Sequence, residues 1–298
     1  MLLLVCQRFV GPKHLRYGRS MARRLDHSLP RGLDDIEVAV FDIDGTLADD
    51  SAHVSDRTVE ALRDLADTGV HIVFASGRMA PALRKLFDRM DRTGYVIGCN
   101  GAITVHTDHD DIIGSGPLGD DLYADALAFG RDEGLETVIF GTDSFYTEDD
   151  GPARQILRGP NEGLIPTLTD LDRLAREDRL KVMYYVDPAR TDGIVGRLRE
   201  RFPATVQTLP EFFEITRNDV DKWTGLEPVL ADLGTSAEKT LGIGDSENDL
   251  SWLPRVGISI AMGNAYESVK EACDYEIGSN SDHAVADLAA AWARHRRR

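Results

Sequence analysis

Residues 36–47 read IEVAVFDIDGTL, an apolar and β-branched run that ends at two carboxylates one residue apart, Asp42 and Asp44. The run is typical of a buried strand, and Gly45 allows the backbone to turn sharply after it. Because Asp and Gly are common in solvated turns, this pattern alone is compatible with a surface turn as well as with a site. In an open α/β sheet, however, ligands bind at the carboxyl ends of the strands, where these two acids stand.

Strand and helix patterns alternate along most of the chain. Before residue 104 the order is strand, helix, strand, helix and strand, over residues 36–41, 55–67, 70–76, 81–90 and 95–103. After residue 208 the alternation resumes with a helix and three strands, over residues 222–232, 240–244, 257–262 and 275–277. This rhythm predicts parallel strands joined by right-handed crossovers. We therefore expect an α/β fold, with a Rossmann-like parallel sheet core and helices on both faces.

The rhythm changes between residues 104 and 208. In and beside this stretch the pattern predicts hairpins over residues 104–113 and 205–216, helices over 119–133 and 189–201, and strands over 137–140 and 180–186. The mixture predicts an inserted α+β domain, so the chain leaves the parallel core and returns to it. We expect the discontinuous core to comprise residues 35–103 and 209–298 and the insertion residues 104–208, with hinges near 103 and over 208–218.

Charge is distributed unevenly along the 298 residues. Residues 1–32 carry seven Lys or Arg and one acid, a charge of +6, so the net charge of −17 leaves −23 on the remainder. We expect residues 1–34 to be a basic, disordered leader. The acidic body argues against nucleic acid as a partner. It would also repel an anionic substrate at long range, so a phosphate site needs positive charge of its own.

Hydropathy and cysteine content indicate the compartment. No run approaches the roughly 18 apolar residues of a membrane span, which argues against a membrane partner and against an ion pump. The first six residues, MLLLVC, are shorter than the apolar region of a secretory signal, about 7–15 residues. Cys6, Cys99 and Cys273 show no C-x-x-C spacing and are expected to be reduced, without a zinc site. We expect a cytoplasmic protein.

Polar side chains gather in four places at or near predicted strand ends. They are D-x-D-G-T at 42–46, Ser76-Gly77-Arg78, Lys222 and the acidic loop Asp245 to Asp249. Each alone could be a turn or a solvated helix start, but the strand ends of a parallel sheet converge on one edge. If Asp42, Asp44 and Asp245 lie within about 4 Å of one another, each pair repels by on the order of 4 kcal/mol at an effective dielectric constant of about 20, so a divalent cation is expected. Oxygen ligands favour Mg²⁺. Carboxylates, a cation, a hydroxyl and a lysine together indicate phosphoryl transfer.

The motifs FDIDGT, ASGR, DVDK and GDSENDL, in this order, resemble those of the haloacid dehalogenase superfamily of phosphatases. The inserted α+β domain resembles the cap of the Cof-type branch of that superfamily. Two further matches are Cys99-Asn100-Gly101-Ala102 and AMGNA at 261–265. The resemblance covers about residues 36–290 and implies the fold described above.

The resemblance also implies roles for individual residues. Asp42 would be the nucleophile and a metal ligand, and Asp44 the general acid and base, with a metal contact through its backbone carbonyl. Asp245 would be the remaining carboxylate ligand of the metal. The residues expected to bind phosphate are Ser76, Gly77, Lys222, Asn248 and Asn100, and those expected to support the site are Thr46 and Asp249.

The sequence departs from the superfamily pattern in two places. Trp223 follows the lysine where Gly is common, and His283 and Ala284 stand where the C-terminal motif has Asp and Gly. We expect Trp223 to pack without displacing Lys222, and His283 to be a surface residue.

The expected function is that of a Mg²⁺-dependent phosphatase acting on a small phosphorylated metabolite, such as a sugar phosphate, through an aspartyl-phosphate. A phosphomutase of the same fold and a non-catalytic binding module remain alternatives. A degenerate module would be expected to lose the nucleophile or the lysine, and both are present. In the cap, residues around Tyr184, Glu211 and Arg217 are candidates for contact with substrate, although a core or surface position is equally compatible with each. The sequence does not indicate the substrate or the oligomeric state.

Overall fold

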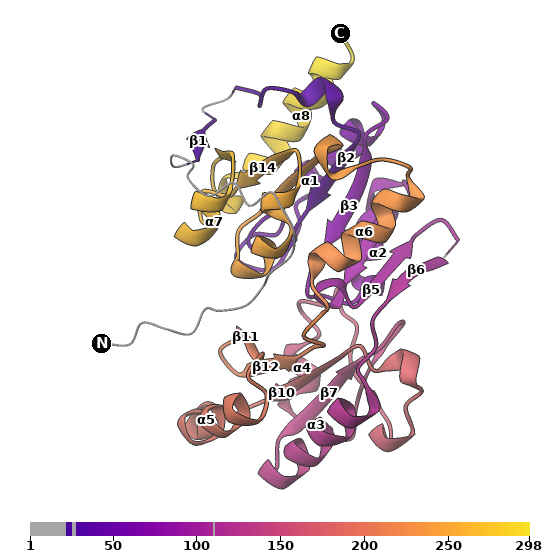
Figure 1. The fold of residues 1–298 in the computed structure, drawn as a ribbon, viewed down its shortest axis with the longest axis vertical. Coiled ribbons are helices and arrows are strands. Elements are labelled where there is room, and N and C mark those ends of the chain that lie inside the picture. Colours follow the sequence, from indigo (N-terminus) through magenta and orange to yellow (C-terminus); the bar gives the residue numbers. More distant parts are fainter. Residues whose placement is uncertain (1–21, 26–27, 110) are drawn as a thin grey trace.

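The computed structural model describes residues 22–25, 28–109 and 111–298. Within these residues the chain forms two β-sheets, which lie one above the other in Figure 1. The larger sheet has nine strands in the order β1-β15-β14-β13-β2-β3-β4-β5-β6, and the smaller has six in the order β11-β12-β10-β7-β8-β9. The larger sheet forms the core domain and the smaller sheet the cap.

The central strands of the core sheet are parallel, which confirms the predicted fold class. They are β15 (Tyr275–Glu276), β14 (Ile258–Ala261), β13 (Thr240–Gly244), β2 (Val38–Phe41), β3 (His71–Ala75) and β4 (Tyr95–Gly98). Every residue of β2, β4, β13 and β14 is buried. A strand that is buried along its whole length must be covered on both faces of the sheet, as βαβ crossovers require.

Five helices pack around this sheet in the described residues, and the sequence predicted the first three of them. They are α1 (Asp56–Ala66), α2 (Ala80–Met90), α6 (Lys222–Asp232), α7 (Glu267–Ala272) and α8 (Ala284–Arg296). Helix α1 packs against α8 and α2, whereas α6 packs against β4, β5 and β6. The start of α1 follows from its cap, because the Ser55 hydroxyl accepts a hydrogen bond from the N–H of Thr58.

The cap sheet is mostly antiparallel. Its strands are β7 (Glu136–Phe140), β8 (Phe145–Thr147), β9 (Thr167–Leu168), β10 (Lys181–Tyr185), β11 (Val206–Leu209) and β12 (Phe212–Ile215). Its helices are α3 (Asp120–Glu133), α4 (Pro152–Ile156) and α5 (Thr191–Arg201). Figure 1 shows α3 and α5 on the side of this sheet that faces away from the core domain.

Both predicted hairpins exist, but the predicted boundaries assign the first to the wrong sheet and divide the second between the two sheets. Strands β5 (Ile103–His106) and β6 (Asp111–Ser115) pair antiparallel along the edge of β4 and so extend the core sheet. Strand β12, placed in the core by the boundary at 208, pairs with β10 in the cap. Alternating apolar residues indicate a hairpin, but they do not say to which sheet edge the hairpin adds. The cap therefore begins after Ser115 and ends after Ile215.

The first 34 residues also differ in part from the expected leader. Strand β1 (Arg23–Arg24) pairs parallel with β15 at the edge of the core sheet. Leu33 begins a short 3₁₀ helix, Leu33–Asp35, and its side chain is buried in the hydrophobic core. Disorder is therefore wrong for these segments, while residues 1–21 and 26–27 lie outside the described part of the chain.

No helix in the described residues is long and apolar enough to span a membrane.

Candidate active site

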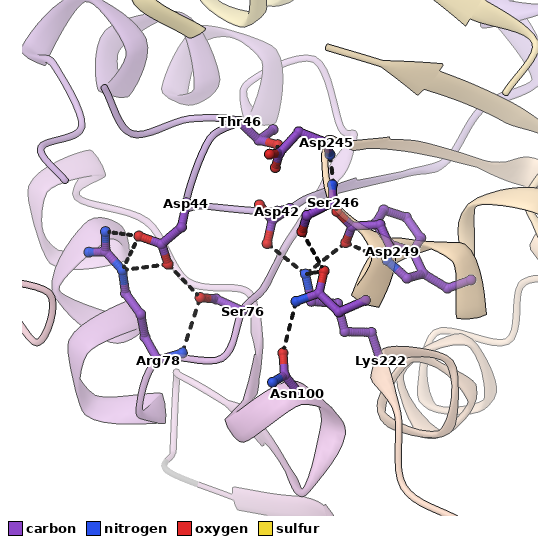
Figure 2. Close-up of polar contacts among 12 residues, drawn as sticks. Asp42, Asp44, Thr46, Ser76, Arg78, Asn100, Lys222, Asp245, Ser246 and Asp249 are labelled. Carbon is purple, nitrogen blue, oxygen red and sulfur yellow. Dashed lines mark hydrogen bonds and ion pairs between the residues drawn. The ribbon is translucent and has the colours of Figure 1, made fainter. Parts of the chain in front are cut away.

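The site lies where the strand order of the core sheet reverses. Strands β3 and β4 follow on one side of β2, and β13, β14 and β15 on the other, so the crevice between β2 and β13 is the topological switch point of the sheet. Asp42 and Asp44 come directly after β2, and Asp245 directly after β13. Figure 2 shows that these side chains gather in one place, together with those of Ser76, Asn100, Lys222 and Asp249.

A buried lysine connects the two aspartate loops. Nζ of Lys222 lies 2.6 Å from Oδ1 of Asp42 and 2.7 Å from Oδ1 of Asp249. Lys222 is the first residue of α6 because Asp221 and Thr224 form a capping box that begins the helix there. The two carboxylates raise the pKa of Lys222, in spite of its burial. Lys222 is thus a buried positive charge at this edge of the sheet, which is compatible with the phosphate-binding role predicted for it.

Asp249 fixes the loop that follows β13. Its Oδ2 accepts hydrogen bonds from the N–H groups of Asp245 and Ser246, at 3.0 and 3.2 Å, and its Oδ1 accepts from Nε1 of Trp252 at 3.0 Å. Both carboxylate oxygens of Asp249 are therefore engaged. This geometry is compatible with the supporting role predicted for the residue, because the loop it holds carries Asp245.

Three carboxylates form a group that could bind a cation. Oxygen atoms of Asp42, Asp245 and Asp249 lie within 4.8 Å of one another. Burial and the neighbouring carboxylates raise the pKa of Asp42 well above its ordinary value, and burial raises that of Asp245 to about 6. Oδ2 of Asp42 is buried and has no hydrogen-bond partner among the described residues. An orphaned oxygen among repelling acids fits a hard divalent cation.

Two small features bring Asp245 close to the β2 loop. Gly45 has a left-handed backbone, with φ of 84°, and a Cβ atom on it would lie 2.4 Å from Oδ2 of Asp245. The hydroxyl of Thr46, the predicted supporting residue, donates to Oδ1 of Asp245 at 3.1 Å. The left-handed backbone favours glycine at position 45, and a larger residue there would also push the Asp245 carboxylate away.

The Asp44 side chain points away from this acidic group. The expected crowding of Asp44 with Asp42 and Asp245 is therefore wrong, because Arg78 holds the Asp44 carboxylate and Asp249 stands in the group instead. Nε of Arg78 lies 3.1 Å from both of its carboxylate oxygens and Nη2 lies 2.6 Å from Oδ1. The hydroxyl of Ser76 donates to Oδ2 at 3.3 Å. The Arg78 side chain is only 4% exposed, whereas that of Asp44 is 53% exposed. Arg78 therefore fixes a carboxylate that is open to solvent.

Sequence reasoning included Arg78 in a motif but gave it no role. The signal was its position, since it follows Ser76 and Gly77 at a strand end that faces the Asp44 loop. The contact between Arg78 and Asp44 joins two loops, and the positions of neighbouring strands bring these loops together. A sequence motif describes one loop at a time, so it does not reveal a contact between two loops.

Replacement of Arg78 by lysine should reduce turnover while the affinity for substrate changes little. A single ammonium cannot reproduce the forked contact with Asp44, so the carboxyl would lose the fixed orientation that its predicted role as general acid and base requires. We expect kcat to fall by roughly 10- to 100-fold. Steady-state kinetics on an aryl phosphate would measure the change. An exposed substitution of the same kind, Arg176→Lys, should have no effect.

Ser76, Asn100 and Lys222, which are predicted to bind phosphate, lie on the side of the site away from Thr46 and Asp245 (Figure 2). Nδ2 of Asn248 donates to Oδ1 of Asn100 at 3.2 Å, and Oδ1 of Asn248 lies 3.5 Å from Nζ of Lys222. Ser76 is fully buried, and its hydroxyl also accepts from the N–H of Arg78 at 3.1 Å. The N–H of Asn100 donates to the Ser76 carbonyl at 3.0 Å, which ties the two loops together.

The turn that carries Asn100 has an unusual backbone. Cys99, Asn100 and Gly101 all have positive φ, at 50°, 55° and 104°. A Cβ atom on Gly101 would lie 1.9 Å from the carbonyl oxygen of Asp221, so only glycine lets this turn approach the start of α6. The N-G-A motif therefore places Asn100 beside the helix that begins with Lys222.

The structure also places the residues that departed from the expected pattern. Trp223 is half-buried, with the guanidinium of Arg255 5.0 Å from its ring centre, so it packs beside Lys222 without displacing it. The backbone of His283 is left-handed at the start of α8, and its Nδ1 lies 3.5 Å from the Ser55 hydroxyl.

Tyr184 is buried inside the cap, where its hydroxyl donates to the Ala126 carbonyl, so it is not a candidate for contact with substrate.

With this geometry in place, the chain can be compared with known proteins. A family model described as haloacid dehalogenase-like hydrolase matches residues 39–288. The chain belongs to the haloacid dehalogenase-like hydrolases. The match confirms the resemblance based on the four motifs, and with it the expectation of a hydrolase of the phosphatase class. Hydrolases of this family generally use a divalent metal, and the acidic group formed by Asp42, Asp245 and Asp249 is compatible with one.

Individual relatives are phosphatases by name. HMP-PP phosphatase of Yersinia pseudotuberculosis is 27% identical over 241 residues, covering 78% of this chain and 86% of its own. The Bacillus subtilis protein 5-amino-6-(5-phospho-D-ribitylamino)uracil phosphatase YcsE is 24% identical over 279 residues, covering 87% and 96%. The crystal structure of a haloacid dehalogenase-like hydrolase from Bacteroides thetaiotaomicron has a TM-score of 0.78 at 25% identity, over 85% of this chain and 98% of that one.

Proposed function

We propose that the protein is a cytoplasmic, Mg²⁺-dependent phosphatase that hydrolyses a small phosphorylated metabolite, such as a sugar phosphate. The observation that carries the proposal is the state of Asp42 at the end of β2. One of its oxygens binds Lys222, and the other is buried without a partner among the described residues. A carboxylate held in this way can attack phosphorus. The names of the relatives support a small phosphorylated substrate.

The reaction proceeds in two displacements. One carboxylate oxygen of Asp42 attacks phosphorus, the bond from phosphorus to the ester oxygen breaks, and Asp44 gives its proton to the departing alcohol. Asp44 then takes a proton from water, whose oxygen attacks phosphorus and releases inorganic phosphate and the Asp42 carboxylate. Lys222 offsets the negative charge that gathers on the phosphoryl oxygens, with Ser76, Gly77, Asn100 and Asn248 around them.

The cation belongs to the acidic side of the site. Asp42, Asp245 and the backbone carbonyl of Asp44 would hold Mg²⁺, and Asp249 would support the loop that carries Asp245. When bound, the ion neutralises charge on the phosphoryl group. The cap selects the leaving group, since the core residues act on the phosphoryl group and on the ester oxygen and leave the rest of the alcohol to other contacts.

Addition of Mg²⁺ should stabilise the protein through Asp245. At 10 to about 100 times the dissociation constant, a ligand of the folded state adds about 1.4–2.7 kcal/mol, or roughly 3–10 °C in Tm for a chain of this size. Thermal unfolding with and without Mg²⁺ measures the shift. The shift should disappear in Asp245→Asn.

A second acidic group supplies the matched control for this experiment. Glu148, Asp170 and Asp172 also lie within 4.8 Å of one another, but they are exposed, and Arg131 binds Glu148 and Asp172. Asp172→Asn should therefore keep the Mg²⁺ shift of the wild type. Equal shifts in wild type and Asp245→Asn would contradict the proposed cation site.

A panel of phosphorylated metabolites, assayed for free phosphate in the presence of Mg²⁺, tests the function itself. Release from at least one small ester is expected. Failure to release phosphate from any ester, including an aryl phosphate, would exclude the phosphatase and favour a binding module. Conversion of hexose 1-phosphate into hexose 6-phosphate without free phosphate would identify a phosphomutase instead.

A further inference from the structure

A buried ion pair stands on the face of the cap sheet that meets the core domain. Nζ of Lys181, on β10, lies 2.8 Å from Oε2 of Glu214, on β12. The two side chains share a face because Glu214 pairs with Met183, two residues along β10 from Lys181. Val182 and Tyr184 point to the other face, into the cluster that the cap helices cover.

The surroundings of this pair are apolar. Lys181 and Glu214 are 1% and 3% exposed, and Nζ of Lys181 lies 4.2 Å from the ring centre of Phe140. Phe212 and Met183 belong to the same hydrophobic cluster as the core domain. Two charges in such a place are costly unless their geometry and remaining hydrogen bonds are good, and an apolar pair would often be as stable. Their contacts therefore indicate what the pair does.

Each member of the pair makes its other contact across the domain boundary. Nζ of Lys181 donates to the carbonyl oxygen of Gly77 at 2.9 Å. Oε1 of Glu214 accepts from Nδ2 of Asn100 at 2.7 Å. Gly77 and Asn100 belong to the two loops on the phosphate side of the proposed site.

The contacts continue from these two loops to the reacting groups. The Gly77 carbonyl belongs to the same peptide unit as the N–H of Arg78, which donates to the Ser76 hydroxyl. On the other loop, Oδ1 of Asn100 accepts from Asn248, whose own Oδ1 lies 3.5 Å from Nζ of Lys222. One charge of the cap thus orients the Ser76 loop, and the other orients the Asn100 side chain.

We infer that Lys181 and Glu214 are positioning residues, which set the phosphate-binding loops of the core in place when the cap is docked. The inference rests on the proposed phosphatase function. Because the pair acts on the phosphate side and not through the leaving group, its loss should slow the hydrolysis of every phosphate ester by a similar factor. A residue that recognised the leaving group would instead affect one substrate and spare a small aryl phosphate.

Two double variants remove both charges and so avoid an unpaired buried ion. Lys181→Met with Glu214→Leu loses both contacts with the core, whereas Lys181→Met with Glu214→Gln keeps an acceptor for Asn100. The first should lower kcat/KM by roughly 10- to 100-fold, mainly through kcat, on an aryl phosphate and on the best metabolite alike. The second should lie between the first and the wild type.

A buried residue of the cap's own hydrophobic cluster, Tyr184, provides the control. Tyr184→Phe removes the hydrogen bond to Ala126 and should leave kcat/KM unchanged. If it reduced kcat/KM as much as the first double variant, general loosening of the cap would explain the result and the inference would be wrong. Wild-type kcat/KM in the first double variant, with the cap folded by circular dichroism, would also overturn it.

Amide hydrogen exchange tests the inference without turnover. Peptides covering residues 76–79 and 98–102 contain the N–H groups of Arg78, Cys99 and Asn100, which bond within the two loops. Their exchange should be at least about fivefold faster in the first double variant than in the wild type or Tyr184→Phe. Unchanged exchange would contradict the positioning role, whether or not the wild type releases phosphate. Absence of phosphate release from the wild type would refute the proposed function but not the positioning role.

Discussion

Asp42→Asn should abolish phosphate release while the protein stays folded. The amide cannot attack phosphorus as the carboxylate does, so the first displacement has no nucleophile, and we expect kcat to fall by about 10⁴-fold or more. Lys222 retains its contact with Asp249, so the buried ammonium keeps a partner. The measurement is phosphate release from an aryl phosphate with Mg²⁺, together with thermal unfolding.

An exposed aspartate in the cap gives the matched control for this change. Asp121 lies on the first turn of α3 and is exposed to solvent. Asp121→Asn removes the same charge far from β2 in the sequence and should keep wild-type turnover. Turnover in Asp42→Asn above about one hundredth of the wild-type value would show that another group attacks phosphorus, since loss of a nucleophile costs far more than this.

Lys222→Met should have the largest effect on stability in the absence of a divalent cation. The substitution leaves the carboxylates of Asp42 and Asp249 buried without their counter-charge, and breaking a buried ion pair in this way costs about 3–5 kcal/mol. Urea unfolding with a chelator present would measure the loss. Activity should fall as well, because the charge that gathers on the phosphoryl group is no longer offset.

The control for this variant is a lysine in an exposed pair. Nζ of Lys239 lies 2.6 Å from Oε1 of Glu37, with both side chains about half exposed. Lys239→Met should leave the free energy of unfolding close to that of the wild type, since solvent screens such pairs. An equal loss in the two variants would mean that the buried contacts of Lys222 do not stabilise the fold.

Most of the core could be predicted from the sequence because its signals are local. The buried runs of β2, β3 and β13 are continuous and apolar, and polar motifs follow each of them directly. The direction of parallel strands then brings the motifs to one edge without knowledge of any contact. The residue roles carried over from the superfamily remain predictions that the variants above would test.

Features that depend on which surfaces meet were missed or misassigned. The hairpin of β5 and β6 could have joined either sheet, and the edge of β4 took it. Arg78 stood in a recognised motif, yet its partner Asp44 is 34 residues away. Lys181 and Glu214 stand in no recognised motif, and their contacts with Gly77 and Asn100 join residues 104 and 114 positions apart.

The sequence by itself determined the parallel core, the order of its motifs and the sheet edge at which the Asp42 and Asp245 loops meet. Strand burial and chain order are sufficient for this, because each strand end is set by its own residues. The tertiary structure alone decided which hairpin joins which sheet, how Asp44 is held, and how the cap contacts the phosphate loops. These depend on the docking of surfaces distant in sequence, where a charge is buried or exposed according to what covers it.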